Sequence, residues 1–141
     1  MELFETPWHV LSGALLLVSG GIVALAIRKS FRLSARIALS LYAWHTVWCL
    51  VYLWYSLNNV ADAVGYYDAA RSGNYSIAPG TDFIGLLTAI FVEYLGLSYA
   101  GTFLVFNILG SIGLIAFYGS LRVAVESKTL FWRRLAILLV F

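Results

Sequence analysis

Charge is scarce in this chain of 141 residues: 11% of them are Asp, Glu, Lys or Arg, whereas 62% are hydrophobic. An ordinary soluble domain carries about 25% charged residues. This composition and the mean hydropathy of +0.87 predict an integral membrane protein. The net charge of +2 comes from basic residues grouped in loops. Such grouping bears on membrane topology and gives no support for nucleic-acid binding.

Cysteine and the motifs of soluble enzymes are also scarce or missing. The single cysteine, Cys49, lies inside an apolar run. It excludes a disulfide within the sequence and a cysteine-based metal site, and it favours a buried, small apolar side chain. The sequence contains no phosphate-binding glycine loop, no nucleophile elbow and no His-Glu-x-x-His motif. The usual catalytic motifs of soluble enzymes therefore have no counterpart in this chain.

Three uncharged runs are long enough to cross a membrane. They cover residues 8–27, 37–57 and 99–121, and a spanning helix needs about 20 residues. Glu2 and Glu5 precede the first run without any basic residue, unlike the start of a cleaved signal peptide. The predicted fold class is therefore all-α, a polytopic transmembrane helical protein with three spanning helices in a single membrane domain, 1–141.

Basic residues indicate which connections face the cytoplasm. One cluster follows the first run and consists of Arg28, Lys29, Arg32 and Arg36. Because cytoplasmic loops are enriched in Lys and Arg, this loop is expected inside and the N-terminus outside. The predicted location is the cytoplasmic (inner) membrane, with membrane lipids as direct partners.

The segment 81–98 is apolar but contains Asp82 and Glu93, and two topologies are open for it. If 81–98 spanned, the basic cluster at 122–134 would lie outside, against the positive-inside rule. We therefore expect a juxtamembrane helix in the outer interface, with Asp82, Ala89, Glu93 and Gly96 on one stripe toward water. The alternative is a short or re-entrant spanning helix with Glu93 buried.

The final segment, "FWRRLAILLVF", begins another apolar run at about residue 131. Seven apolar residues after Arg134 are too few to cross a bilayer. The pattern predicts the start of a fourth spanning helix and hence an N-terminal fragment of a longer protein. The missing C-terminal helices, or a partner subunit, would then complete any site between helices.

The outer loop, 58–80, is the most polar part of this apolar chain. Asp62, Tyr66, Ala70 and Gly73 recur at about helical spacing. This spacing predicts a short helix at the membrane surface that ends at Gly73. Asp68 and Arg71 lie three residues apart in the sequence, so we expect them to pair across one turn of this helix.

Asp62 stands where the second spanning run meets water, with no basic residue three or four positions away. A carboxylate at such a place can accept a proton from a substrate hydroxyl or hold a divalent cation. The alternative is that Asp62 is simply solvated. The sequence does not assign a metal, and Asp62 is the one candidate ligand.

The segment "DAVGYYDAARSG" resembles the first extracytoplasmic loop of the GT-C class of membrane glycosyltransferases. The chain as a whole, with "PGTDFI", "GLSYAGTFLVFNILGSIGL" and "FWRRLAILLVF", also resembles bacterial polysaccharide polymerases, which share the substrate class. Asp62, Tyr66, Ala70 and Arg71 match that loop in register, whereas Ala63 replaces its second acidic residue. The resemblance implies a polyprenyl-linked sugar as substrate and Asp62 as catalytic base or metal-associated carboxylate. It also implies substrate binding by Arg71, on a lipid phosphate or pyrophosphate, and by Tyr66, on the sugar or within the loop.

A second hypothesis comes from another class of protein. The chain would be a non-enzymatic membrane subunit or a transporter fragment, with the outer loop as a lid or docking surface. Within the spanning runs, His45 is either a functional ionisable group or a neutral side chain bonded to a neighbouring helix. Asn107 is expected to form a hydrogen bond across helices.

Overall fold

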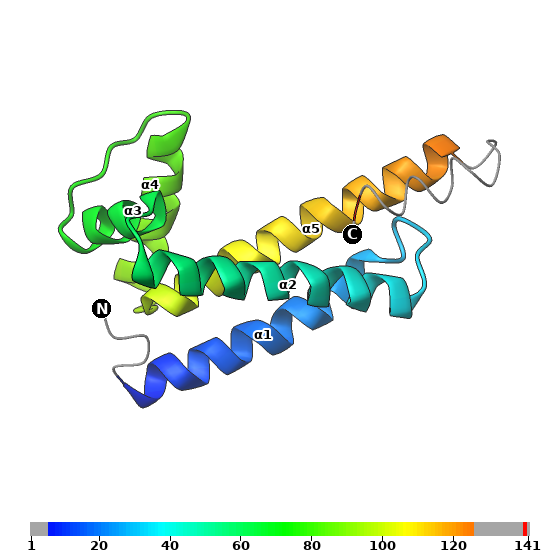
Figure 1. The fold of residues 1–141 in the computed structure, drawn as a ribbon, viewed down its shortest axis with the longest axis horizontal. Helices are drawn as coiled ribbons and strands as arrows, with labels where there is room; N and C mark the ends of the chain where they lie inside the picture. Colours follow the sequence, from blue (N-terminus) through cyan, green and yellow to red (C-terminus); the bar gives the residue numbers. More distant parts are fainter. Residues whose placement is uncertain (1–5, 126–139, 141) are drawn as a thin grey trace. The chain divides into compact units, whose positions relative to one another are not determined.

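The computed structural model describes residues 6–125 and residue 140 (Figure 1). All secondary-structure elements in these residues are helices, and no strand occurs among them, so the all-α prediction is confirmed. Three helices are long and apolar enough to cross a membrane: α1 (Pro7–Ile27), α2 (Ala35–Asn58) and α5 (Tyr99–Val125). The predicted fourth helix, from about residue 131, lies outside the described residues.

The helices extend beyond the apolar runs that predict them. Helix α2 begins at Ala35 and includes Arg36, because Ser34 caps it: the Ser34 hydroxyl accepts a hydrogen bond from the backbone N–H of Ile37 at 3.3 Å. Helix α5 likewise includes Arg122. A charged residue ends an apolar run without ending the helix, since Arg is a good helix former.

The outer loop contains the predicted short helix, α3 (Asp62–Arg71). Gly73 follows it with a φ of +67°, the left-handed conformation that ends many helices and suits glycine. The predicted Asp68–Arg71 ion pair is wrong: these residues form no ion pair within 4.0 Å in the described chain. The Arg71 guanidinium instead lies 6.0 Å from the centre of the Tyr67 ring, where a cation–π contact replaces the carboxylate.

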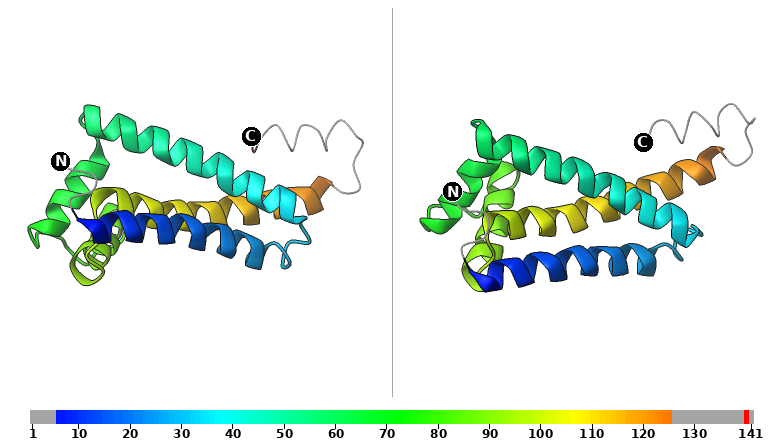
Figure 2. Two further views of the ribbon diagram at one scale, coloured as in Figure 1. Left: turned by 90° about the horizontal axis from the view of Figure 1, so that it is seen from below. Right: turned by 60° about the horizontal axis from the view of Figure 1, so that its bottom comes forward.

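The segment 81–98 is an interrupted helix. An α-helix, α4 (Thr81–Ala89), continues into a five-residue π-helix, η1 (Ile90–Tyr94), and Gly96 then turns the chain with a φ of +58°. The predicted stripe is wrong at Ala89, which is 1% exposed. Helix α3 packs against α4 and η1 (Figures 1 and 2), so part of the stripe faces protein.

Helices α4 and η1 are short in comparison with the three candidate spanning helices. Their nine and five residues reach about 21 Å at 1.5 Å per residue, short of a hydrocarbon core of about 30 Å. Glu93 is exposed, and its carboxylate accepts a hydrogen bond from the Tyr75 hydroxyl at 3.2 Å. Glu93 is thus not buried within the described chain. The juxtamembrane helix stays a prediction, and so does the alternative of a short or re-entrant spanning helix.

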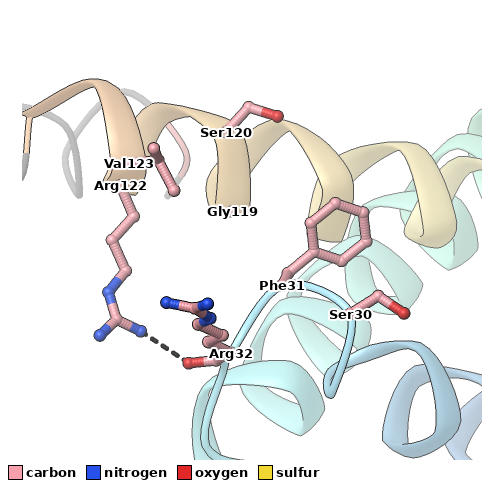
Figure 3. Close-up of a pocket in the computed structure, with 7 residues that line it drawn as sticks. All are labelled: Ser30, Phe31, Arg32, Gly119, Ser120, Arg122 and Val123. Carbon is pink, nitrogen blue, oxygen red and sulfur yellow. Dashed lines mark hydrogen bonds between the residues drawn. The ribbon is translucent and has the colours of Figure 1, made fainter.

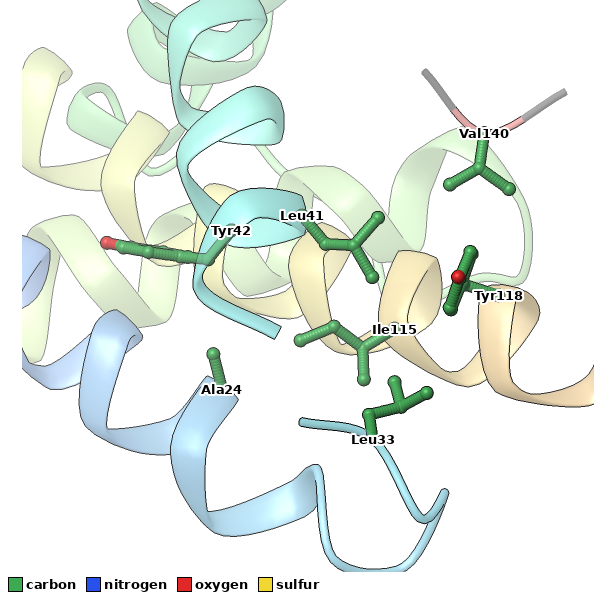
Figure 4. Close-up of a cluster of buried hydrophobic side chains, with 7 residues drawn as sticks. All are labelled: Ala24, Leu33, Leu41, Tyr42, Ile115, Tyr118 and Val140. Atoms are coloured by element: carbon green, nitrogen blue, oxygen red, sulfur yellow. The ribbon is translucent and has the colours of Figure 1, made fainter. Parts of the chain in front are cut away.

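The chain divides into two compact units. We call residues 1–16 with 49–105 the acidic unit and residues 17–48 with 106–141 the basic unit, after the charges they carry. Each unit has its own buried apolar cluster. The cluster of the acidic unit consists of Leu53, Tyr67, Tyr99, Ala100 and Phe103. That of the basic unit consists of Ala24, Leu33, Leu41, Tyr42, Ile115, Tyr118 and Val140 (Figure 4).

Candidate functional site

A groove of about 750 Å³ opens where α2 gives way to α3, within the acidic unit. Ala61, with an extended backbone (φ −139°), directly precedes the first residue of α3, Asp62. The polar side chains on the groove wall are those of Ser56, Asn58, Asn59, Asp62 and Asp68. Helix geometry thus brings two carboxylates to one open site.

The Asp62 carboxylate has no bonding partner among the residues that the structure describes. The side chain is exposed and forms no hydrogen bond or ion pair with any residue between 6 and 125. Asp62 also begins α3, where the positive end of the helix dipole favours a negative charge. The carboxylate therefore has a favourable place at the helix start and remains available to a ligand.

The neighbouring polar side chains present acceptors to the groove. The Asn58 and Asn59 amides each donate to a carbonyl of the last turns of α2, at 2.7 Å and 2.9 Å. The Ser56 hydroxyl donates to the Leu53 carbonyl at 2.8 Å. Each amide nitrogen therefore uses one of its two donors within the protein, and the groove wall carries two amide oxygens and two carboxylates as acceptors. Such a surface suits a ligand rich in hydroxyl donors, or a cation.

The other acidic side chains of the outer loop have structural partners. The Ser76 hydroxyl donates to the Asp82 carboxylate at 2.5 Å, and Tyr75 donates to Glu93. The hydrogen bond and the negative charge of Glu93 raise the pKa of the Tyr75 hydroxyl above its usual value. These two contacts hold the loop 72–80 to the α4–η1 segment, which leaves Asp62 and Asp68 as the candidate acids of the loop.

Tyr66 lies one turn after Asp62 on α3, whereas Arg71 lies at the far end of this helix. Neither Tyr66 nor Arg71 lines the groove. Arg71 follows Asp62 by nine residues, which places it about 13 Å along the helix and about half a turn round it. Sequence reasoning assigned Asp68 to a pair with Arg71 and missed it as a groove residue. The spacing of Asp62, Gly65 and Asp68 could have identified Asp68 as a groove residue. Residues three apart on an α-helix differ by only about 60° around the helix axis, so successive members of this series are neighbours on the helix surface.

The described residues offer few ligands for a metal ion. No group of three or more His, Cys, Asp and Glu side chains that could hold a metal ion occurs in the described part of the chain. Mg²⁺ is commonly held by one or two carboxylates together with water and substrate phosphates. Asp68 follows Asp62 by six residues, about 9 Å along the helix and a third of a turn round it, so a metal ion held here would have Asp62 alone as its carboxylate ligand from α3.

Exposed aromatic rings stand in the last turns of α2 beside the groove. Trp54 is 68% exposed, and Tyr52 and Tyr55 are each 46% exposed. Trp and Tyr are typical of the boundary between lipid and water. Their apolar faces also stack on sugar rings, so this end of α2 suits an amphipathic ligand.

A second set of polar side chains lies inside the basic unit. Asn107 is 1% exposed, and its amide donates to the Thr46 hydroxyl at 2.9 Å, which confirms the predicted bond across helices. His45 does not form the expected hydrogen bond to a neighbouring helix, and its role as a functional ionisable group stays a prediction. It has no hydrogen bond with a described residue, and its ring lies so close to Gly110 that a Cβ there would overlap Nε2.

Comparisons of the chain with protein-family models, with curated proteins and with solved structures found no match in any of the three. The resemblance to membrane glycosyltransferases stays a prediction, and the argument for function rests on the groove.

Proposed function

We propose that this chain contributes three spanning helices to an integral membrane glycosyltransferase or polysaccharide polymerase. It acts on polyprenyl-phosphate-linked sugars at the outer face of the cytoplasmic membrane. One observation carries the proposal: the Asp62 carboxylate has no partner in the described chain and opens into an acceptor-rich groove at the end of a candidate spanning helix.

The groove chemistry matches the substrate class. A sugar presents many hydroxyl donors, which the oxygens of Asn58, Asn59 and Asp68 can accept. The polyprenyl chain requires a hydrocarbon environment next to the site, and α2 supplies a helix of spanning length that ends at the groove. Exposed Trp54 and Tyr55 mark the boundary that such a substrate would cross.

Asp62 has a defined task in this proposal. Its carboxylate accepts the proton of the acceptor hydroxyl as that oxygen forms a bond to the anomeric carbon of the donor sugar. The bond between the anomeric carbon and the lipid phosphate oxygen breaks, and the lipid phosphate leaves with the electron pair. If a divalent cation takes part, Asp62 is the residue that would hold it, and the ion would supply positive charge to stabilise the leaving phosphate.

The proposal gives Arg71 and Tyr66 less direct roles than Asp62, because neither of them lines the groove. Arg71 is exposed on α3, away from the groove, and from there it would contact the lipid phosphate only from the opposite side of the helix. Tyr66 is half-buried beside Tyr67 and would support the loop or a bound sugar. The remainder of the lipid and sugar pocket would come from further helices or from a partner subunit.

The test is Asp62→Asn in the full protein, assayed in membranes for transfer of lipid-linked glycan. We expect turnover to fall by about 10²- to 10⁴-fold, since a general base contributes on that order. Membrane abundance should not change, because Asp62 has no structural partner in the described chain. The matched control is Asp82→Asn, whose carboxylate binds Ser76 and lies outside the groove. Turnover that survives Asp62→Asn would contradict the proposal.

A non-enzymatic membrane subunit is the second candidate. The observation that favours it is that Arg71 and Tyr66, the two residues expected to bind substrate, do not line the groove that Asp62 lines. This candidate predicts that Asp62→Asn, Asp68→Asn and the double variant all keep full function. It also predicts that a change of surface on α3, such as Arg71→Glu, disrupts assembly with a partner.

A further inference from the structure

The basic unit contains a second cavity, which the proposed function does not use. It has a volume of about 580 Å³, and the loop between α1 and α2 forms one wall while the last turns of α5 form the other. Its lining residues are Ser30, Phe31, Arg32, Gly119, Ser120, Arg122 and Val123 (Figure 3). Two guanidinium groups and two hydroxyls therefore stand beside an apolar ring and an apolar Val side chain.

The two arginines are held together by the backbone. The Arg122 guanidinium donates to the Arg32 carbonyl oxygen at 2.9 Å, which joins α5 to the loop (Figure 3). Both side chains are exposed, and neither forms an ion pair with a described residue. Arg122 uses one of its donors in this bond, so most of the donors of both guanidinium groups stay available.

The backbone at Arg32 is unusual. The N–H of Leu33 donates to the Arg28 carbonyl at 2.9 Å, and the N–H of Arg32 donates to the Lys29 carbonyl at 3.2 Å. These two bonds form the Schellman motif, which closes many helices and places one residue in the left-handed region. That residue is Arg32, with a φ of +51° and the only positive φ of a non-glycine residue in the described chain.

Glycine is the usual residue at this position, because a Cβ disfavours the left-handed conformation. An arginine here is locally unfavourable for the fold, yet it directs a guanidinium to the cavity that Arg122 also lines. A strained backbone position of this kind is a reason to look for a function of its side chain.

Charge in the basic unit is unbalanced. The unit contains eight of the nine basic residues of the chain and a single acidic one, Glu126, which lies outside the described residues. Glu126 can neutralise at most one of the eight. The excess of basic residues over carboxylates within the unit therefore favours an anionic ligand for the arginine pair.

We infer that this cavity binds the phosphate of an anionic phospholipid headgroup. Arg32 and Arg122 supply charge-assisted donors for the phosphate oxygens, and Ser30 and Ser120 supply hydroxyls nearby. Phe31 and the 69% exposed Val123 provide apolar surface for the glycerol and the first acyl carbons, which a free phosphate ion would not need. Basic pockets between spanning helices are typical sites for such headgroups. The inference does not depend on the proposed enzymatic activity.

The test measures the dissociation constant for short-chain phosphatidylglycerol with the full chain in zwitterionic detergent. Each arginine near a lipid phosphate contributes roughly a fivefold factor in affinity, and two contribute about 30-fold. We expect Arg32→Gly and Arg122→Gln each to weaken binding about fivefold and the double variant about 30-fold. Arg36→Gln is the matched control, since it removes one exposed charge of the same loop region outside the cavity.

Arg32→Gly separates binding from folding. Glycine relieves the backbone at the positive φ, so the melting temperature without anionic lipid should stay the same or rise while lipid binding falls. If the melting temperature falls instead, Arg32 has a structural role and the inference is wrong. An equal loss of binding with Arg36→Gln would also overturn it, because binding would then belong to the whole basic surface.

A second arm distinguishes the source of the phosphate. Inorganic phosphate is titrated against the bound lipid in the same detergent. We expect phosphatidylglycerol to remain bound at phosphate concentrations that exceed its own by orders of magnitude, since the apolar wall contacts only the lipid. Displacement at comparable concentrations would show a general anion site and contradict the lipid assignment.

Discussion

The acidic unit contains six of the seven acidic residues of the chain and one of the nine basic ones, whereas the basic unit contains one acidic and eight basic residues. Each of the three candidate spanning helices has residues in both units. The charges are thus divided between the two units, with the acidic residues mostly in one and the basic residues mostly in the other. Under the positive-inside rule, this division is what a fixed orientation in the membrane requires.

The two units also differ in how their helices approach each other. In the basic unit, glycines meet aromatic side chains: a Cβ at Gly20 would lie 2.5 Å from the Tyr42 hydroxyl oxygen, and a Cβ at Gly119 would lie 2.7 Å from Phe31 Cβ. In the acidic unit the aromatic rings meet one another, with Tyr99 5.2 Å from Tyr67 and 5.0 Å from Phe103 between ring centres. Close backbone packing in one unit thus contrasts with ring packing around a polar groove in the other.

The largest expected effect comes from the charges themselves. Replacement of the four basic residues of the α1–α2 loop by Gln removes half of the charge that is expected to hold the basic unit inside. Part of the population should then insert with its N-terminus inside, detected by an impermeant reagent on a residue of the outer loop. Arg71→Gln removes a charge from the acidic unit and should leave the orientation unchanged. A uniform, unaltered orientation of the fourfold variant would show that other features set the topology.

The next effect concerns the glycine contacts. Gly119→Ala should destabilise the fold by about 1–3 kcal/mol, because the new Cβ overlaps Phe31 close to its backbone. Gly113 lies on the same helix with nothing within 4 Å, so Gly113→Ala should be neutral or stabilise by up to about 1 kcal/mol. The free energy of unfolding in mixed detergent micelles measures both. Equal effects at the two positions would contradict the close packing of the basic unit.

A smaller effect is expected for the buried hydrogen bond. Thr46→Val leaves the Asn107 amide without its acceptor and should cost about 1 kcal/mol of unfolding free energy. Asn107→Leu should cost less, because Thr46 keeps its own bond to the Tyr42 carbonyl and the partnerless Asn107 Oδ1 atom is removed. The reverse order of these two variants would show that the Oδ1 atom has a partner in the membrane.

The smallest expected effect concerns the hydrogen bond between Tyr75 and Glu93 in the acidic unit. Because Glu93 raises the pKa of Tyr75, the neutral hydroxyl is favoured in the folded state. The resulting stabilisation is complete below the ordinary tyrosine pKa of about 10 and is lost as the pH rises through the raised value. The measurement is an absorbance titration of the wild type from which the titration of Tyr75→Phe is subtracted. The difference gives the titration of Tyr75 alone. Glu93→Gln should return its pKa toward 10, and an unchanged titration would exclude the contact.

Much of the helical framework was predictable because it depends on local chemistry. Apolar length predicted the three candidate spanning helices, and the spacing after Asn59 predicted α3 and its end at Gly73. The helix limits were less predictable, since the Ser34 cap carries α2 past Arg36 while hydropathy stops at that charge. Local sequence patterns therefore predict which elements form better than where they end.

Two of the missed features depend on contacts between distant residues, and a third, the contact of Arg71 with Tyr67, is a choice between two partners on the same helix. Ala89 is buried because α3 packs on α4, which a helical period alone cannot show. Arg71 turns to the Tyr67 ring, although the sequence also offers a carboxylate at Asp68. Asp62 was found because it lacks a nearby basic residue, whereas the groove around it arises from the junction of two helices and is visible only in three dimensions.

Cysteine accessibility tests the central claim most directly, namely that the acidic unit faces outward and the ends of the basic unit face the cytoplasm. In a Cys49→Ala background, which has no other cysteine, single cysteines replace Asn74, Ser34 or Ala124, all of which are exposed. We predict that an impermeant maleimide labels Asn74→Cys on intact cells and labels Ser34→Cys and Ala124→Cys only after permeabilisation. Labelling of Ala124→Cys on intact cells would show that 81–98 crosses the membrane and would contradict the account.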